Sequence, residues 1–272
     1  MKHASRNNLR HTVLLGGLLC LFAVWPAILK AAGDSTPDPV ALIKASTDAV
    51  SLTAADMDAT LSIYDTRGNV RTRRIQQASR VFDGVTKTRL TFLAPADVAG
   101  TRLLIYDYPD KDDDMWIFLP ALRNTRRIVS REKGQSFMGS SFSHADLSKP
   151  ALGDHTHHLT GSEELEGRDC WVVTSTCKTS SIAQAQGYAA KKAWIDKKTR
   201  LTRQLVFLNA AGQRIKVLVL GDYKQLDDGT FMACRLEATT LPNKRRSLLT
   251  IDALRPGNTL APDYFSSLSL GK

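Results

Sequence analysis

Short runs in which apolar and polar residues alternate recur along most of the chain, and this period of two constrains the fold more than any other feature. In the first run, Ala59, Leu61 and Ile63 alternate with polar neighbours, which is typical of a strand with one buried face. Comparable runs, bounded by clusters of Gly, Pro and Asp, follow at 70–82, 86–93, 101–107, 114–119, 169–177, 192–196, 201–208, 213–224, 230–239 and 246–253. The pattern predicts a mainly β protein with few helices and about 10–11 strands.

The connections between these runs are short and turn-like, as at 209–212 (NAAG), which favours antiparallel pairing. In the run 213–224 both faces are partly apolar, because Val217 and Val219 alternate with leucines. A sheet this large must curl or be covered. We therefore expect a curved antiparallel sheet with one face packed by helices or holding a ligand, preceded by a helix near 38–51 that begins at Asp38 and Pro39.

The first 33 residues have the layout of a signal peptide. Lys2, Arg6 and Arg10 precede an apolar stretch at 12–29, and small residues at 31–33 (AAG) offer a cleavage site. This layout predicts export to the periplasm and removal of residues 1–33, leaving residues 34–272 as a single domain. A retained N-terminal anchor is the alternative, because the apolar stretch is at the lower limit for spanning a bilayer.

The charge balance indicates which kinds of partner to expect. The chain has a formal net charge of +10, and without the four basic residues of the leader it keeps about +6. A basic protein favours anionic surfaces such as lipid headgroups, and export makes nucleic acid the weakest candidate among them. Of the cysteines beyond the leader, Cys170 and Cys177 are too far apart on one strand to pair with each other, so at most one of them can pair with Cys234.

A long segment at 132–159 interrupts the strand pattern and is predicted to be a loop with a functional or mobile role. It ends in a histidine cluster, in which His155, His157 and His158 follow Asp154. These side chains offer ligands for zinc or copper. The alternative, which we favour, is a solvated and pH-sensitive histidine patch, since no established metal-binding spacing accompanies them. No cofactor is predicted.

Catalytic motifs are also missing from the sequence. There is no Gly-x-Ser-x-Gly elbow and no glycine-rich phosphate loop ahead of a helix. We therefore predict a binding protein and no enzyme. Arg126 and Arg127 form part of a basic stretch that is suited to contact an anionic headgroup or a partner protein, and ordinary charge on an edge strand is the other interpretation.

Several motifs resemble the LolA-like outer-membrane lipoprotein-sorting protein family: 115–122 (MWIFLPAL), 126–128 (RRI), 134–142 (GQSFMGSSF) and 146–147 (DL). Ser141 and the His144-Ala145 pair depart from the family pattern. The resemblance implies an incomplete β-barrel, closed by helices over its concave face, around a cavity that accepts acyl chains.

The residues themselves suggest which side chains face such a cavity. The strand 114–119 is apolar on both faces, so it can pack a core while lining a cavity. Phe137, Met138 and Phe142 lie in a glycine-flanked loop that is suited to form a movable apolar lid. Plain core packing is the alternative for each of the candidates, which are Leu61, Ile63, Leu90, Phe92, Leu103, Ile105, Trp116, Phe118, Phe137, Met138 and Phe142.

The leading hypothesis is a periplasmic carrier or chaperone, acting as a monomer, that shelters the acyl chains of a lipid or lipoprotein during transfer toward the outer membrane. Apolar burial would provide the binding energy, and no covalent step is needed. The alternative is a sensor or accessory subunit that uses the same fold to bind an inner-membrane, lipid-exporting transporter.

Overall fold

The computed structural model describes residues 36–109, 111–149 and 151–272. The predicted signal peptide lies outside these residues. None of the helices in the described part is long and apolar enough to cross a membrane.

A short helix, α1 (Pro39–Asp48), opens the described chain. The Asp38 carboxylate accepts hydrogen bonds from the backbone N–H groups of Val40 and Ala41, and Pro39 occupies the first helical position. Both features favour a helix start at this point, because they satisfy or remove free N–H groups. A second helix, α2 (Ser180–Gln186), ends at Gly187, which adopts a left-handed conformation.

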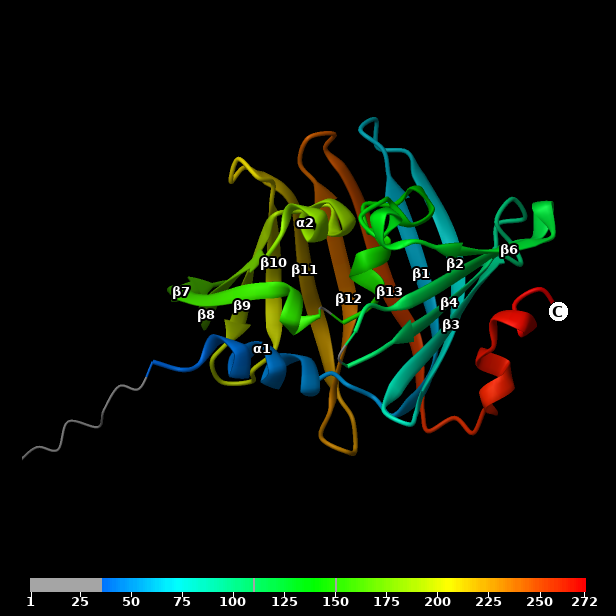
Figure 1. Cartoon of the computed structure of the whole chain (residues 1–272), viewed down its shortest axis with the longest axis horizontal. Helices are drawn as coiled ribbons and strands as arrows, with labels where there is room; N and C mark the ends of the chain where they lie inside the picture. The colour runs from blue at the N-terminus through cyan, green and yellow to red at the C-terminus, as the bar shows by residue number, and fades with distance from the viewer. Residues whose placement is uncertain (1–35, 110, 150) are drawn as a thin grey trace, which may run out of the picture. The chain divides into compact units, whose positions relative to one another are not determined.

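All the strands of the described residues form one antiparallel sheet (Figure 1). The thirteen strands are β1 (Ala54–Tyr64), β2 (Val70–Phe82), β3 (Val85–Ala94), β4 (Arg102–Asp107), β5 (Asp114–Leu119), β6 (Asn124–Ile128), β7 (His155–Leu165), β8 (Arg168–Cys177), β9 (Ala190–Asp196), β10 (Thr202–Leu208), β11 (Arg214–Gln225), β12 (Phe231–Thr240) and β13 (Arg245–Pro256).

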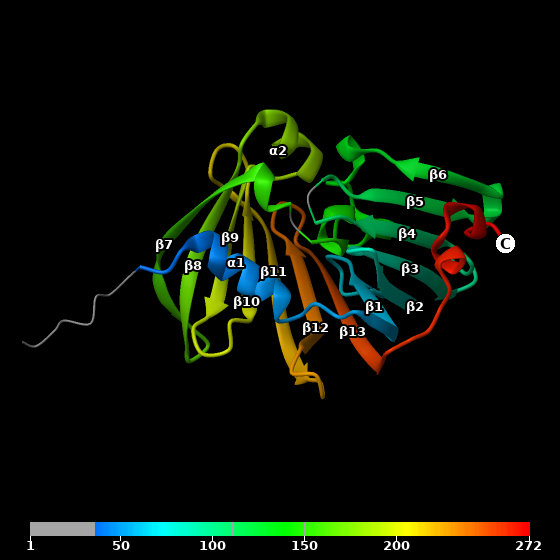
Figure 2. The same cartoon turned by 60° about the horizontal axis from the view of Figure 1, so that its bottom comes forward.

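The order of the strands joins the two halves of the chain. It runs β6-β5-β4-β3-β2-β1-β13-β12-β11-β10-β9-β8-β7, so β1 pairs with β13 and the two edges, β6 and β7, do not pair with each other. The sheet is therefore an open, curved one, as expected (Figure 2). The expected count of about 10–11 strands was too low, because β6 and β7 are polar edge strands without a clear apolar alternation.

The two faces of the sheet are covered by different segments. The inner, concave face lies against α1 and a covering loop made of residues 129–149 and 151–154. On the outer face, residues 257–272 pack against β2 to β5, where Phe265 and Leu270 are fully buried. Three arginines of the outer face, Arg80, Arg89 and Arg102, donate hydrogen bonds to carbonyl oxygens of this C-terminal segment.

Two of the candidate cavity residues lie on the outer face. Trp116 and Phe118 pack against the cluster that contains Phe265 and Leu270, while their neighbours Met115 and Ile117 point to the inner core. The prediction that Trp116 and Phe118 line the cavity is therefore wrong. A strand that is apolar on both faces does not reveal which face is the inner one.

The three cysteines of the described part are all unpaired. Cys170 and Cys234 are buried, as small apolar side chains often are. Burial also raises the pKa of the Cys170 and Cys177 thiols, so both remain protonated at neutral pH.

Candidate ligand-binding site

A cavity of about 490 Å³ lies between the inner face of the sheet, α1 and the covering loop. This volume is in the range of small-molecule sites, about 300–1,000 Å³. Most of the side chains that the sheet contributes to its wall are apolar: Met57, Ala59, Leu61, Ile75, Leu90, Ala193, Ile195, Leu205, Phe207, Leu218, Leu220, Met232, Ala233, Leu236, Leu249 and Ile251.

The helix α1 covers one side of this cavity. Leu42 and Ile43 are buried against Val173, Ala193 and Ile195 of the inner face. The Ser46 hydroxyl lies 2.7 Å from the hydroxyl of Thr202 and fixes the helix near the start of β10. The helix is thus attached to the sheet by both apolar and polar contacts.

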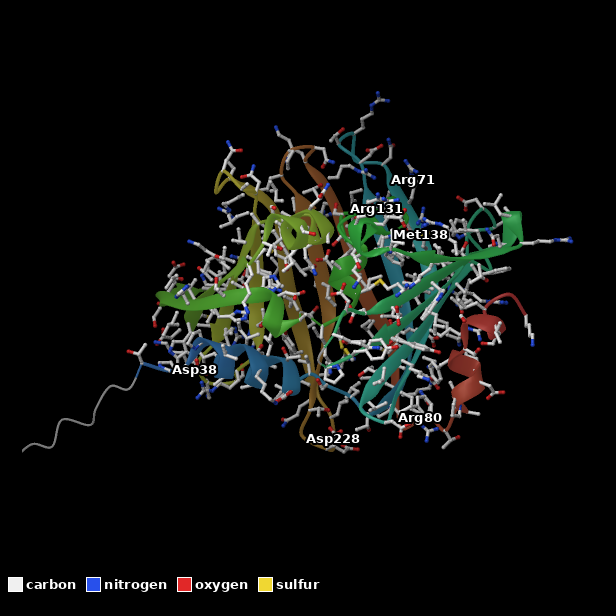
Figure 3. All side chains as sticks on the ribbon, viewed as in Figure 1. Asp38, Arg71, Arg80, Arg131, Met138 and Asp228 are labelled. Carbon is white, nitrogen blue, oxygen red and sulfur yellow. The ribbon has the colours of Figure 1, made fainter. Side chains whose placement is uncertain are left out.

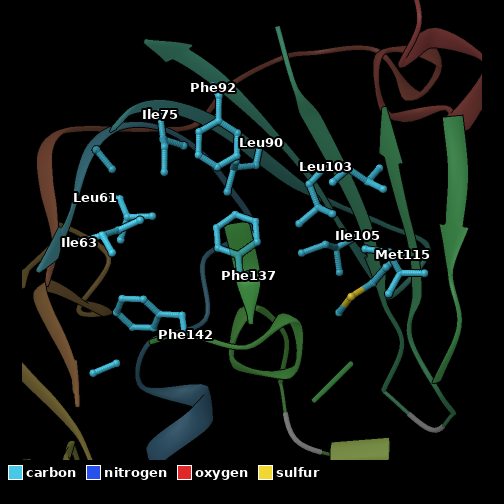
Figure 4. Packing of buried hydrophobic residues seen from close by; sticks show 14 of the residues in the cluster. Leu61, Ile63, Ile75, Leu90, Phe92, Leu103, Ile105, Met115, Phe137 and Phe142 are labelled. Carbon is cyan, nitrogen blue, oxygen red and sulfur yellow. The ribbon is translucent and has the colours of Figure 1, made fainter. Parts of the chain in front are cut away.

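The covering loop inserts a tight turn, residues 137–142, into the inner face. The Phe137 N–H donates to the Phe142 carbonyl over 2.8 Å, and Met138 and Gly139 both have a positive φ. Figure 4 shows Phe137 and Phe142 directed toward the apolar side chains of the sheet. Phe137 lies 5.7 Å from Phe92 between ring centroids, so this turn forms part of the hydrophobic core.

Two arginines of the sheet donate hydrogen bonds to backbone carbonyls of the same turn. Arg73 donates to the Met138 carbonyl and Arg245 donates to the Gly139 carbonyl, each over 2.5 Å. Figure 3 places Met138 toward the end of the sheet where Arg71 lies, and Asp228 at the opposite end.

A close approach of two glycines joins the covering loop to α2. A β carbon at Gly134 would lie 2.6 Å from the backbone nitrogen of Gly187, a distance that does not allow a side chain. The Gly134 N–H donates to the Ala185 carbonyl over 2.8 Å. The glycine at position 134 is therefore required by packing.

A buried ion pair fixes the covering loop to β11. The Lys216 ammonium lies 2.7 Å from the Asp146 carboxylate, and the two side chains are only 12% and 6% exposed. The same carboxylate accepts a hydrogen bond from the Ser143 N–H, also over 2.7 Å. Because both charges are buried, each depends on the other.

Three residues after Asp146, the loop is joined to the β4–β5 hairpin. The Asp107 carboxylate accepts a hydrogen bond from the Lys149 N–H over 3.2 Å. Burial, with a smaller contribution from the nearby Asp113, raises the pKa of Asp107 to about 6. Burial also raises the pKa of Asp113.

Sequence reasoning missed these polar positions. Asp146 was part of a motif but was given no role, and Lys216 and Lys191, which also lines the cavity, were not singled out. Lys191 and Lys192 are adjacent in the sequence and point to opposite faces of the strand. The sequence alone does not show which of the two lysines faces inward.

The remaining candidates fall into two groups. Leu61, Leu90, Phe137 and Phe142 line the cavity. Ile63, Phe92, Leu103 and Ile105 are buried in the adjoining core, and Met138 packs against that core without being fully buried.

Arg126 and Arg127 are exposed on the edge strand β6. Each already has a carboxylate partner, Glu132 for Arg126 and Asp114 for Arg127. Neither of these two residues lines the cavity.

All three histidines of the cluster lie on β7, where the rings of His155 and His157 lie 6.0 Å apart between centroids. His155 is buried, with Nδ1 3.1 Å from the Ala151 carbonyl, and His157 lies between the Ser175 hydroxyl and the Leu152 carbonyl. His158 occupies the alternate, exposed position. The described residues contain no group of three or more His, Cys, Asp and Glu side chains placed to hold a metal ion.

Comparison with known proteins adds to this picture. A family model described as that of an uncharacterized protein matches residues 84–272. The model of DUF1329, a protein family of unknown function, matches residues 23–135. A DUF1329 family protein from Desulfovibrio piger has the same fold, with a TM-score of 0.78 and 25% identity over 86% of this chain and 100% of that chain.

Two further solved structures bear on the fold. A domain from Vibrio parahaemolyticus, named for outer membrane lipoprotein sorting, has a TM-score of 0.79 and 24% identity over 86% of this chain and 98% of that one. A LolA superfamily protein from Nitrosomonas europaea has a TM-score of 0.67 and 15% identity over 85% of this chain and 98% of that one. The chain therefore has a LolA-like fold, as the sequence resemblance implied, and it belongs to the family of uncharacterized proteins whose model covers residues 84–272. No curated protein matches it.

The LolA-like fold accounts for the open sheet and its covered inner face. The cavity wall, the buried ion pair and the polar groups around it are properties of this chain's own side chains.

Proposed function

We propose that this LolA-like protein is a carrier of lipid-like cargo, and that it shelters acyl chains in the cavity between the inner face of the sheet, α1 and the covering loop. The observation that carries the proposal is the apolar wall of this cavity, where Leu205, Leu220 and Leu236 remain only half-buried. Leucines left incompletely covered inside a protein gain from contact with an apolar ligand.

The energetics of such binding need no chemical step. Each methylene moved from water into the cavity contributes about 0.8 kcal/mol, so a chain of moderate length binds by burial alone. Release then requires only that α1 or the covering loop moves away from the sheet. The protein acts as a binding protein without a covalent intermediate.

The proposal includes the periplasm as the place of action. It is supported by the signal-peptide layout of residues 1–33 and by the name of the Vibrio parahaemolyticus domain, which refers to the outer membrane. N-terminal sequencing of the protein from a periplasmic extract tests this part. A mature chain beginning near residue 34 is expected, and a full-length chain in the membrane fraction would contradict it.

The carrier function is tested by mass spectrometry of lipids that co-purify with the protein and by binding of a neutral fluorescent acyl probe. Leu220→Trp places an indole in the cavity and should abolish probe binding. Val219→Trp introduces the same side chain at the neighbouring position of β11, which points to the other face of the sheet. This variant should leave probe binding intact. The proposal fails if the native protein contains no lipid and binds no probe, or if the two variants bind equally.

A further inference from the structure

A row of paired residues crosses strands β8 to β11 on the inner face of the sheet. In the strand register, Ser175 of β8 is opposite Lys191 of β9, and Lys191 is opposite Phe207 of β10. Phe207 is in turn opposite Lys216 of β11. Two residues further along, the corresponding row consists of Val173, Ala193, Leu205 and Leu218. The inner face therefore changes from charged to apolar within two residues.

The two lysines of this row differ in their partners. Lys216 pairs with Asp146 of the covering loop, and its ammonium lies 4.1 Å from the centre of the Phe207 ring. Lys191 lines the cavity, but no ion pair among the described residues includes it. Asp146 therefore neutralises the charge of Lys216, and Lys191 has no such partner among the described residues.

Two carboxylates act near Lys191: Asp146, which is paired with Lys216, and Asp154, which acts on Tyr188, Cys177 and His155. The other titratable groups around Lys191 add no negative charge. Tyr188 and Cys177 stay protonated, since burial raises both pKa values. Burial also lowers the pKa of His155 to about 4, so its ring is neutral, and Nε2 lies 3.3 Å from the Tyr188 hydroxyl. His157 is held by Ser175 and a backbone carbonyl. Within the described part of the chain, Lys191 is thus a cavity-lining ammonium that forms no ion pair of its own.

Burial disfavours the charged form of Lys191. Burial lowers the pKa of Lys191 to about 8, with Asp146 opposing the shift. An ammonium group without a counter-ion costs free energy in such a place, and an anionic ligand would remove that cost.

We propose that Lys191 binds the anionic headgroup, a carboxylate or a phosphate, of an amphiphile whose alkyl chain lies on the apolar wall of the cavity. This inference rests on the proposed carrier function and defines the class of cargo: a free anionic lipid. An acyl chain attached to a protein through an ester or amide carries no such charge and would leave Lys191 unpaired.

The test compares three ligands of equal chain length by displacement of the neutral dye Nile red at pH 7: dodecanoate, dodecyl phosphate and methyl dodecanoate. The native protein should bind an anionic ligand about tenfold more tightly than the ester, a difference of about 1.4 kcal/mol. Comparison of dodecanoate with dodecyl phosphate shows which headgroup the site prefers. The preference should decline above about pH 8, where Lys191 loses its proton.

Lys191→Met keeps the length of the side chain and removes the charge, and it should abolish the preference while retaining binding of the ester. Lys192→Met is the matched control, because the neighbouring side chain points to the opposite face of β9, and it should behave as the native protein does. The pH series on the native protein provides a second measurement that does not depend on the folding of a variant.

Each outcome discriminates between the two proposals. If none of the three ligands binds to the native protein, the carrier function itself fails. If all three bind equally well, or if Lys191→Met keeps the preference, the carrier function stands and the role of Lys191 is overturned.

Discussion

The two ends of the inner face have the same alternating pattern and different packing. At the packed end, β3 to β6, Phe92, Leu103 and Met115 are almost completely buried beneath the turn at 137–142. At the open end, β9 to β13, Leu205 and Leu236 are half-buried and line the cavity.

The difference lies in what covers each end. The covering loop inserts Phe137 into the packed end, and an aromatic ring fills the space above the sheet. Over the open end the loop contributes the ion pair of Asp146 with Lys216, and α1 contributes Ser46 and Thr47 to the cavity wall. Apolar alternation therefore predicts an inner face, and the covering segments decide whether it becomes a core or a binding site.

The largest expected effect comes from making one substitution at both ends. Leu103→Ala should lower the free energy of unfolding by about 4 kcal/mol, because it creates a void in a closed core. Leu236→Ala should cost about 1 kcal/mol, because this leucine is half-buried and already borders a cavity. Urea unfolding measures both, and equal losses would show that the open end is packed as firmly as the other.

The next effect concerns the attachment of the loop to the open end. Asp146→Ala should cost about 3 kcal/mol, because it leaves the buried ammonium of Lys216 without a counter-ion. The double variant Asp146→Leu with Lys216→Met should recover most of this stability, since it removes both charges. Thermal unfolding of the native protein and the two variants measures the effect, and a double variant no more stable than Asp146→Ala would contradict the role of the unpaired ammonium.

Most of the sheet could be predicted from its sequence, because the apolar alternation is local information. The run containing Leu61 and Ile63 becomes β1, whose residues alternate between buried and partly exposed. The edge strands β6 and β7 were missed for a physical reason. Each pairs on one side only, and much of β7 is exposed on both faces, so neither strand needs an apolar face.

The site could be predicted only in part. The inward positions of Leu61 and Leu90 follow from alternation, but the outward position of Trp116 and Phe118 depends on residues 257–272, which are remote in sequence and cover them. The isolation of Lys191 depends on where the covering loop places Asp146. Such information belongs to the tertiary structure and has no local signature.

A smaller, pH-dependent effect is expected where the covering loop contacts Asp107 of β4. Burial raises the pKa of Asp107 from 3.8 to about 6, so the folded protein binds a proton more tightly than the unfolded chain does. Stability should therefore fall as the pH rises from about 4 through 6. Asp107→Asn should remove this decline and be the more stable protein at pH 7, by on the order of 2 kcal/mol. Unfolding curves at pH 4, 5.5 and 7 measure the effect, and identical pH profiles would contradict the assignment to Asp107.

The smallest effect is expected at the edge of the packed end. Arg126 and Arg127 are exposed, and each faces a carboxylate across water-accessible surface, so replacing both by alanine should change the free energy of unfolding by less than about 1 kcal/mol. The affinity for dodecanoate should stay within about twofold of the native value, because the unpaired charge lies at Lys191 in the open end. A tenfold loss of dodecanoate binding in the double variant would instead place the headgroup at β6 and make the packed end, rather than the open end, the site of charge recognition.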